Sequence, residues 1–402
     1  MSGNVFSSSQ QLSTLKKPSF ASLITRLAPN GQSPLFALTS MMKTEVAVQV
    51  EHGYFSKTML FPSATSVAAS QASTLTTLEV GDTTNLLANM IMRVDGTDEN
   101  IIINAVLSPT QLQVTRAIGT IAAATIPSST KMWMVGNAFE ESSLRPGALR
   151  IDSVANTNYT QIFRNTWAIS DTMRNTMNIA GDSNIAENKQ DAATFHAADI
   201  EKALSFSQKF ASTRNGQPFR TMEGVIANTV LNAAGNVTTL GATTTLTQLE
   251  SAVDPIFNQT TDPSSSGERV MFVGGKARSV LNQVGRLNGT VQLMDGQTSF
   301  GLQFSSFKVS RGMIRIIEHP LFNAFGSTST FSKMGVIVDL PTFALAYLGD
   351  RKTQHKPFNA DNDANDNGID AVGGTLTTEV TALFKNPQAN AVLYAFTAGA
   401  AG

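Results

Sequence analysis

The chain has 402 residues, of which 42% are hydrophobic and 15% are charged, a composition typical of globular proteins that bury a sizeable core. It carries 29 Lys and Arg against 30 Asp and Glu, so the composition predicts no bulk attraction to nucleic acid or to an anionic membrane. It has no cysteine, which excludes disulfides, thiolate metal sites and a cysteine nucleophile.

The N-terminal segment is polar. Residues 1–17 (MSGNVFSSSQQLSTLKK) lack the apolar run of a secretion signal, and nowhere do about 18 apolar residues follow one another. We therefore expect a soluble protein made in the cytosol, beginning with an arm. Between Phe20 and Leu27 apolar residues recur at helical spacing, which predicts a first short helix.

The next segment, residues 44–61 (TEVAVQVEHGYFSKTMLF), is predicted to be one long strand. Val46, Val48 and Val50 alternate with smaller or polar residues, which is the period of a strand. Large apolar residues extend it: Tyr54, Phe55, Met59, Leu60 and Phe61. A long two-stranded excursion is only marginally stable alone, so these residues predict a neighbouring molecule that covers them.

Residues 71–137 change in character. They contain five short β runs at regular spacing, separated by turn signals such as Asp95-Gly96 and Ser108-Pro109. This pattern predicts a small self-contained barrel or sandwich. Extended structure resumes through residues 143–170, so we expect the small domain to be inserted between an outgoing and a returning strand.

The returning strand is predicted at residues 158–170 (NYTQIFRNTWAIS). It places Arg164 three residues before Trp167, and it contains no nucleophile with a base nearby. Trp133 and Trp167 are the two tryptophans of the chain, and no aromatic ladder with interleaved Arg surrounds either of them. We therefore expect both to anchor packing.

A long helix is predicted next. About 30 residues after Ser183 contain neither Pro nor Gly, which allows a helix on the order of 45 Å long at 1.5 Å per residue. After Gly216 the pattern becomes mixed α/β, with a capping-box spacing at Thr247 and Glu250. Buried strands and short helices follow in the segments RVMFVGG, GKARSVLNQVG, FKVSRGMIRIIEH, MGVIVDL, TTEVTALF and NAVLYAF.

A search for catalytic motifs gives none. The four histidines are too far apart in sequence to suggest a metal-binding helix, and no G-x-S-x-G elbow occurs. The segment VGGKAR, residues 273–278, lacks the first Gly and the Ser or Thr of a phosphate loop, so it predicts a tight strand-to-helix turn. We expect no catalytic, cofactor-binding or metal-binding residue.

One segment has ligand-like spacing. In residues 361–370 (DNDANDNGID), Asp363, Asn365, Asn367 and Gly368 match the first half of a calcium loop. The acid at the twelfth position is missing, since Gly374 stands there. A polar turn between strands accounts for the same residues, and calcium binding stays open.

Several segments together resemble a known family. They are EVAVQVEHGYF, NYTQIFRNTWAISDTM, the long helix after AGDSNIAENKQ, the link NGQPFRTMEGV, and MFVGGKARSVLNQVG. In their order they resemble the major capsid proteins of tailed bacteriophages with the HK-ninety-seven fold, from Phe20 to Phe396. The resemblance implies an α+β subunit with an N-terminal arm, an extended β loop, a long spine helix and an axial α/β domain. The small all-β domain would be inserted in the extended loop.

The resemblance also implies the division of the chain. The expected parts are 1–43, arm and short helices; 44–170, extended loop; 71–137, inserted β-barrel-like domain; 171–220, spine helix (residues 184–212) and peripheral domain; 221–340, axial domain; and 341–402, C-terminal strands returning to the peripheral and axial domains. The extended loop would lie over the next subunit. The residues expected to make contacts between subunits are Tyr54, Phe55, Met59, Phe61, Arg164 and Trp167.

The implied function is an icosahedral shell of pentamers and hexamers that encloses double-stranded DNA. Its partners would be other copies of the chain, packaged DNA on the inner face, and portal, scaffold or decoration proteins, with no membrane. The protein would be found in the virion after assembly in the host cytoplasm. Two alternatives stay open: a surface adhesin or glycan-binding protein, and a shell of the same fold that encloses enzymes.

Overall fold

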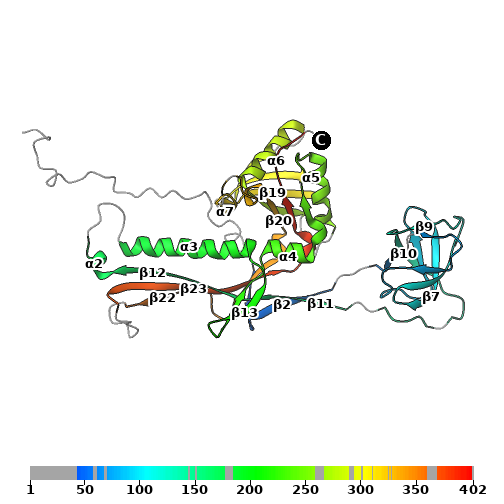
Figure 1. The fold of residues 1–402 in the computed structure, drawn as a ribbon, viewed down its shortest axis with the longest axis horizontal. Helices are drawn as coiled ribbons and strands as arrows, with labels where there is room; N and C mark the ends of the chain where they lie inside the picture. The colour runs from blue at the N-terminus through cyan, green and yellow to red at the C-terminus, as the bar shows by residue number, and fades with distance from the viewer. Residues whose placement is uncertain are drawn as a thin grey trace, which may run out of the picture. The chain divides into compact units, whose positions relative to one another are not determined.

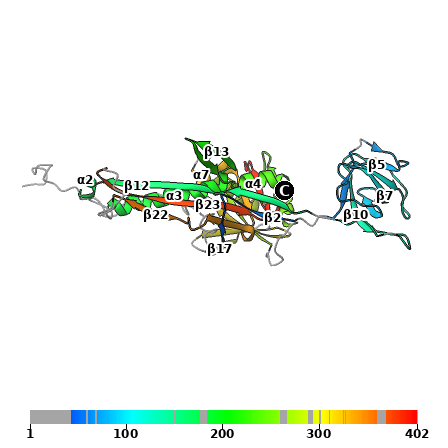
Figure 2. The ribbon, with the colours of Figure 1, turned by 90° about the horizontal axis from the view of Figure 1, so that it is seen from below.

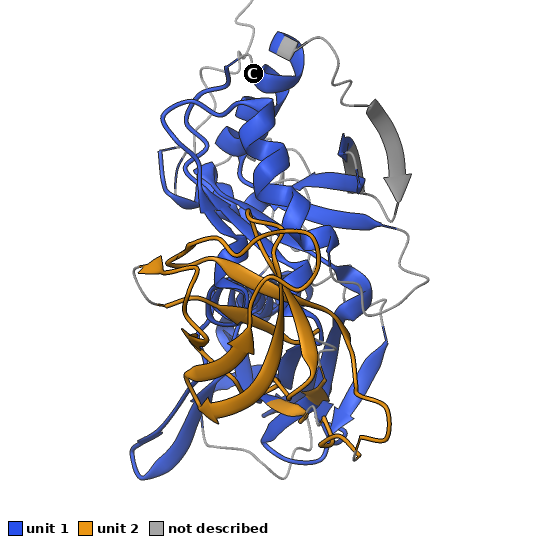
Figure 3. Cartoon of the chain, turned by 90° about the vertical axis from the view of Figure 1, so that its right-hand side faces the viewer, with its two compact units in different colours: residues 1–54, 156–402 blue, residues 55–155 orange. Residues whose placement is uncertain are grey.

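The computed structural model describes residues 43–57, 61–67, 70–143, 145–149, 152–176, 184–258, 267–288, 294–299, 302–309, 311–324, 326, 328–359 and 369–400. The chain divides into two compact units (Figure 3). Unit 1 is Met1–Tyr54 with Asn156–Gly402, and unit 2 is Phe55–Ala155. The fold contains both sheets and separate helices, so the predicted α+β class is confirmed.

Unit 2 is all β among its described residues. Its main sheet has the order β3 (Ser63–Thr65), β10 (Lys131–Asn137), β6 (Met90–Val94), β7 (Asn100–Ser108), β8 (Gln111–Thr115), β5 (Thr77–Glu79), and β4 (Ser70–Gln71) pairs with β9 (Ile126–Pro127). Each of the five predicted β runs contains a strand. The alternating apolar residues of these strands form one buried core, around Met92, Ile101 and Leu112.

A buried ion pair also stabilises unit 2. Arg116 donates two hydrogen bonds of 2.7 Å to the two oxygens of Glu99, and both side chains are buried. Burial alone would raise the pKa of Glu99. The bonds from Arg116 and from the backbone of Ala124 and Ala117 outweigh it and hold the pKa below its usual value.

The first sheet of unit 1 joins strands from distant parts of the chain. Its order is β1 (Thr44–Ala47), β21 (Phe343–Leu348), β23 (Ala371–Phe384), β12 (Gln161–Ser170), and β22 (Gln354–Phe358) also pairs with β23. A short helix, α2 (Asp171–Arg174), follows β12. The long helix α3 (Asn184–Phe206) lies along β12 and β23 (Figure 1), and Figure 2 shows β12, β23 and β22 side by side.

The second sheet of unit 1 has seven strands. Its order is β15 (Val237–Thr239), β24 (Ala391–Tyr394), β20 (Gly335–Val338), β16 (Glu268–Val273), β19 (Gly312–Glu318), β18 (Leu302–Val309), β17 (Met294–Ser299). Its helices are α4 (Val225–Asn232), α5 (Leu246–Val253), α6 (Gly275–Asn288) and α7 (Pro320–Asn323). Short 3-10 turns are η2 (Ala234–Asn236), η3 (Asp254–Phe257), η4 (Phe331–Lys333), η5 (Leu340–Thr342) and η6 (Pro387–Ala389).

The segment VGGKAR is a strand-to-helix turn, as predicted. β16 ends at Val273 and α6 begins at Gly275. A Cβ on Gly274 would lie 2.4 Å from the carbonyl oxygen of Ser332. Gly274 therefore permits close backbone packing in this turn.

The prediction of one long strand over residues 44–61 is wrong, because this segment contains two separate strands. β1 ends at Ala47, residues 48–50 bend, and β2 (Glu51–Ser56) begins a separate ribbon with β11 (Val154–Tyr159). The small Ala47 packs against Ala344 and Ala346, and Val46 and Val48 face outward. The alternation of the valines therefore marks an exposed face.

The predicted spine helix is too long. α3 ends at Phe206, and residues assigned to its last turns form β13 (Phe210–Arg214), which pairs with β14 (Gln217–Thr221). Asn215 and Gly216 between these strands have positive φ angles of 51° and 74°. An Asn-Gly pair in this conformation favours a two-residue hairpin turn, and this local preference ends the helix early.

Two further predictions are corrected. The capping box of α5 lies at Thr245 and Gln248, two residues before the predicted pair, because Thr245 holds the extended backbone of an N-cap. Trp133 is 46% exposed, so it does not anchor packing, whereas Trp167 is buried.

Some expectations fall on residues without a description. The arm, the first short helix, Met59 and residues 361–368 of the half calcium loop lie outside the described residues. Within the described part of the chain, no helix is long and apolar enough to span a membrane, and no group of three His, Asp or Glu residues could hold a metal ion.

Candidate assembly site

The predicted contact residues of the extended loop differ in exposure. Phe55 is 79% exposed and Phe61 is 84% exposed. Tyr54 is half-buried, and its hydroxyl donates a hydrogen bond to the carbonyl of Phe384 in its own unit. Burial, with the charge of Glu223 adding to it, raises the pKa of the Tyr54 hydroxyl to about 12. Phe55 and Phe61 are thus open to solvent, whereas Tyr54 is bonded to β23.

The two predicted residues of β12 point to opposite faces of the sheet. Arg164 is exposed and makes no hydrogen bond or ion pair with the described residues. Trp167 packs against Ala192 of α3 and Leu376 of β23, and its indole N–H donates a 3.1 Å hydrogen bond to Nε2 of His355. Because side chains alternate between the two faces of a strand, Trp167 faces the core and Arg164 faces the surface.

Asn158, which is buried on β11, holds the base of the β2–β11 ribbon. Its amide nitrogen donates to the carbonyls of Glu223, at 3.1 Å, and Ala382, at 2.8 Å. Its amide oxygen accepts the backbone N–H groups of Glu223, at 2.7 Å, and Tyr159, at 2.8 Å. One side chain thereby ties β11 to β23 and to the segment before α4.

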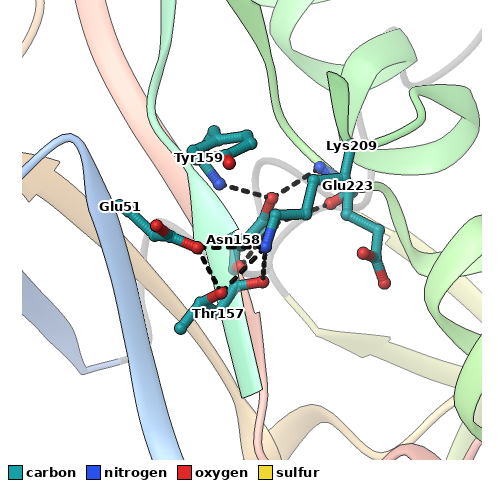
Figure 4. Close-up of polar contacts among 7 residues, drawn as sticks. Glu51, Thr157, Asn158, Tyr159, Lys209 and Glu223 are labelled. Carbon is teal, nitrogen blue, oxygen red and sulfur yellow. Dashed lines mark hydrogen bonds and ion pairs between the residues drawn. The ribbon is translucent and has the colours of Figure 1, made fainter. Parts of the chain in front are cut away.

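A second set of contacts surrounds Lys209, which follows α3 (Figure 4). Its ammonium donates to the carbonyl and hydroxyl of Thr157, at 2.7 and 2.8 Å, and lies 3.3 Å from Glu51 of β2. It also lies 4.7 Å from the ring centre of Tyr159. Hydrogen bonds from Thr157 and Lys209 lower the pKa of Glu51. We call Glu51, Thr157, Asn158, Tyr159, Lys209 and Glu223 the loop-base cluster.

Helix α3 is attached to the sheet by polar groups as well as by apolar ones. His196 is buried, and its two ring nitrogens lie 2.7 Å from Oδ1 of Asn165 on β12 and from the hydroxyl of Thr378 on β23. Asn165 also donates to Asp199, at 3.0 Å. Burial lowers the pKa of His196, and the charge of Asp199 opposes this in part.

The far end of α3 is joined to the second sheet. Glu201 and His319 are both buried, and their side chains meet at 2.8 Å. His319 directly follows β19 and caps α7. This pair and the apolar core around Leu204 and Phe322 join the helix to the seven-stranded sheet.

Three of the predicted contact residues, Phe55, Phe61 and Arg164, are exposed and Trp167 is buried, and the sequence contained no sign of the residues that hold the β2–β11 ribbon. Asn158 and Lys209 gave no motif, because their partners lie 65 and 158 residues away in sequence. The Asn-Gly pair at 215–216 was a usable signal, since it predicts the hairpin that places Lys209 beside the loop.

A chain with an inserted β unit, a helix-covered sheet and large exposed apolar residues is a structural subunit suited to association with other copies. The model of the family described as SU10 major capsid protein matches residues 5–397. The major capsid protein of Pseudomonas phage PaMx41 is 37% identical over 401 residues, which cover 97% of this chain and 94% of that protein. The chain belongs to the SU10 major capsid protein family. It is a phage major capsid protein, and its copies form the capsid shell.

Solved structures give a more distant comparison. A structure from Mycobacterium phage Cain is 12% identical, covers 98% of this chain and 99% of its own, and has a TM-score of 0.49. One from Microbacterium phage Oxtober96 is 9% identical, covers 98% of this chain and 99% of its own, and has a TM-score of 0.48. Because these scores lie below 0.5, the assignment rests on the sequence matches.

Proposed function

We propose that copies of this chain form pentamers and hexamers of an icosahedral shell that encloses the double-stranded DNA of a tailed phage. The observation that supports contacts between copies of the chain is the exposure of Phe55 and Phe61 to solvent. Removing a large apolar side chain from water stabilises association by about 1.5–3 kcal/mol. Repeated at every subunit, such contacts favour a closed assembly.

The parts of the chain have separate roles in this proposal. Residues 44–170 form an extended loop that lies over the next subunit, and the loop-base cluster fixes where that loop leaves the body. Residues 221–340 form the axial domain around the capsomer centre, and residues 171–220 form the spine and peripheral region. We assign the chain no catalytic, cofactor-binding or metal-binding role.

The partners follow from the same proposal. The shell would contain a portal for DNA entry and would assemble in the host cytoplasm, where a scaffold or decoration protein would add to contacts that the copies of this chain already make among themselves. The family match does not favour the adhesin alternative. Nuclease treatment of purified particles distinguishes a shell that encloses a genome from one that encloses enzymes. We expect double-stranded DNA that is protected from the nuclease. Particles filled with protein alone would contradict the proposal.

The contact role is tested by the double substitution Phe55→Asp and Phe61→Asp. We expect it to lower the yield of shells at least tenfold, since two charges replace two apolar contacts in every copy, and to leave the melting of the subunit within about 2 °C. The control pair Phe55→Tyr and Phe61→Tyr keeps both rings and should assemble. Sedimentation measures the yield of shells. Normal shells from the Asp variant would show that Phe55 and Phe61 do not lie in the interface between copies.

A further inference from the structure

Strand β22 is a short outer strand of the first sheet of unit 1. Among the described strands it pairs with β23 alone. Three of its five residues are exposed and none is buried, and one of them is Pro357, which has no backbone N–H to donate. A segment with so little burial opens more readily than the body of the protein, so its side-chain contacts decide how firmly it is held.

Two rings of β22 lie over two glycines of β23. A Cβ on Gly374 would clash with Nε2 of His355, and one on Gly373 would clash with the ring of Phe358. Because neither glycine has a side chain, both rings can approach the backbone of β23 closely. These two contacts therefore attach β22 to the sheet.

The ring of His355 also reaches across β23 to β12. The register pairs His355 with Leu376 and Trp167 with Gly374, so both rings lie on the face of the sheet that α3 covers. The indole N–H of Trp167 donates a 3.1 Å hydrogen bond to Nε2 of His355. The two rings are stacked, with their centroids 5.9 Å apart and their planes 10° apart. This contact bridges β12 and β22, which do not pair with each other.

The bond to Trp167 fixes the protonation state of His355. An indole nitrogen can only donate a hydrogen bond, so Nε2 of His355 must accept it. The imidazole is therefore neutral, with its proton on Nδ1. A second proton would bind Nε2 and turn the acceptor into a donor, so that two N–H groups would face each other. The bridge can form only with the neutral ring.

The charged groups that face His355 come from α3. At 100° per residue, three titratable side chains lie within about 60° of Ala192, which packs against Trp167: Lys189, His196 and Asp199. His196 and Asp199 both bond to Asn165 of β12. Among the described residues, the faces of β12, β22 and β23 turned to α3 carry no titratable group besides His355.

Two effects oppose the protonation of His355 in the folded chain. Burial lowers its pKa below the ordinary 6.5, and the positive charge of Lys189 lowers it further. When β22 leaves the sheet, the ring returns to water and to its ordinary pKa. Between the lowered value and 6.5, the free ring binds the proton and the bridged ring does not. Attachment of β22 is therefore complete above pH 6.5 and weakens as the pH falls through this window.

We propose that the contact between His355 and Trp167 is an acid-sensitive switch, which holds β22 on the sheet at neutral pH and releases it in acid. The ten residue pairs between β12 and β23 do not involve His355, so they stay intact. Release of β22 uncovers an edge of β23, and an uncovered edge can pair with another strand. Acid thereby changes the surface that the subunit presents.

Hydrogen exchange of the full-length chain tests the switch, and it needs no assembly. Exchange of residues 354–358 is measured at pH 7.5 and pH 5, and each rate is divided by the intrinsic rate of the unfolded peptide at that pH. We expect protection to fall at least fivefold at pH 5. The control His355→Gln keeps an acceptor and does not titrate, so its protection should change less than twofold.

Residues 161–170 of β12 report on the body in the same experiment. At pH 5 they should stay at least tenfold better protected than β22, because the release is local. Three results would overturn the proposal: protection of β22 that does not fall in acid, an equal fall in the His355→Gln chain, or an equal loss of protection in β12.

Lys189→Gln tests the same switch from the helix side. It removes a positive charge that opposes protonation, so the loss of protection in β22 should begin at a higher pH. Lys308→Gln, which removes an exposed lysine from β18 in the second sheet, should leave this pH unchanged. A midpoint that is the same in the Lys189 variant and the unaltered chain would contradict the proposal.

Discussion

At the scale of single residues, Asn158 shows how one side chain fixes the β2–β11 ribbon to the rest of unit 1. A carboxamide has two N–H donors and two acceptor lone pairs, and Asn158 uses both donors and both acceptor positions. An aspartate lacks the donors and an alanine lacks all four groups. Because the contacts with Glu223 and Ala382 are buried, these backbone groups cannot turn to water when the amide is removed.

Asn158→Ala is therefore expected to lower the free energy of unfolding by about 2–4 kcal/mol, since it leaves buried donors and acceptors unpaired. Chemical denaturation of the unassembled subunit measures it. Asn104→Ala serves as the control, because Asn104 is exposed and bonds to the exposed Thr115. A loss below about 0.5 kcal/mol at Asn158 would show that the cluster does not hold the loop.

His196 predicts a dependence of stability on pH. Burial lowers its pKa in the folded chain below the ordinary 6.5. Between the lowered value and 6.5, the unfolded state binds the proton and the folded state does not, so stability is complete above pH 6.5 and falls as pH falls through this window. His355, whose pKa burial also lowers, adds in the same direction.

His196→Gln should reduce this slope, because it removes one of the titrating groups. The measurement is the free energy of unfolding of both proteins between pH 5 and pH 7.5. The substitution should also cost about 1–2 kcal/mol at pH 7.5 through a weaker bridge to Asn165 and Thr378. An unchanged slope would assign the pH dependence to other groups.

At the scale of elements, local patterns predicted what is local. The five β runs of unit 2 and the turn at Gly274 follow from strand period and glycine geometry. Two of the wrong predictions have physical causes that the structure shows. The valines after Thr44 face outward because Ala47 packs against the small residues of β21. Helix α3 ends before its predicted end because Asn215 and Gly216 form the turn of a hairpin. Contacts such as that of Asn158 with Ala382 depend on the tertiary fold and give no local signal.

Unit 2 is expected to be separable from unit 1. The contacts Val50 to Thr160 and Ser56 to Val154 run in opposite directions along the β2–β11 ribbon, as in a hairpin. Replacing residues 57–153 by Asn-Gly should close this ribbon with a two-residue turn and leave unit 1 with one cooperative transition in calorimetry. Loss of cooperative melting in the shortened chain would show that unit 1 depends on unit 2.

At the scale of the whole molecule, the chain combines a body stabilised by polar contacts with side chains that its own fold leaves exposed. The polar contacts are the loop-base cluster, the bonds of His196 to Asn165 and Thr378, and the Glu201–His319 pair. The uncovered features are the aromatic side chains of Phe55 and Phe61. A shell subunit needs both, because the body must keep its shape while each contact between copies contributes only modestly.

The central claim is that this chain alone carries the contacts that build a shell. Electron microscopy of the full-length protein, purified without other phage proteins and concentrated, tests it most directly. We predict rings or closed particles built from fivefold and sixfold units. A protein that stays monomeric at high concentration, with and without a crowding agent, would contradict the account.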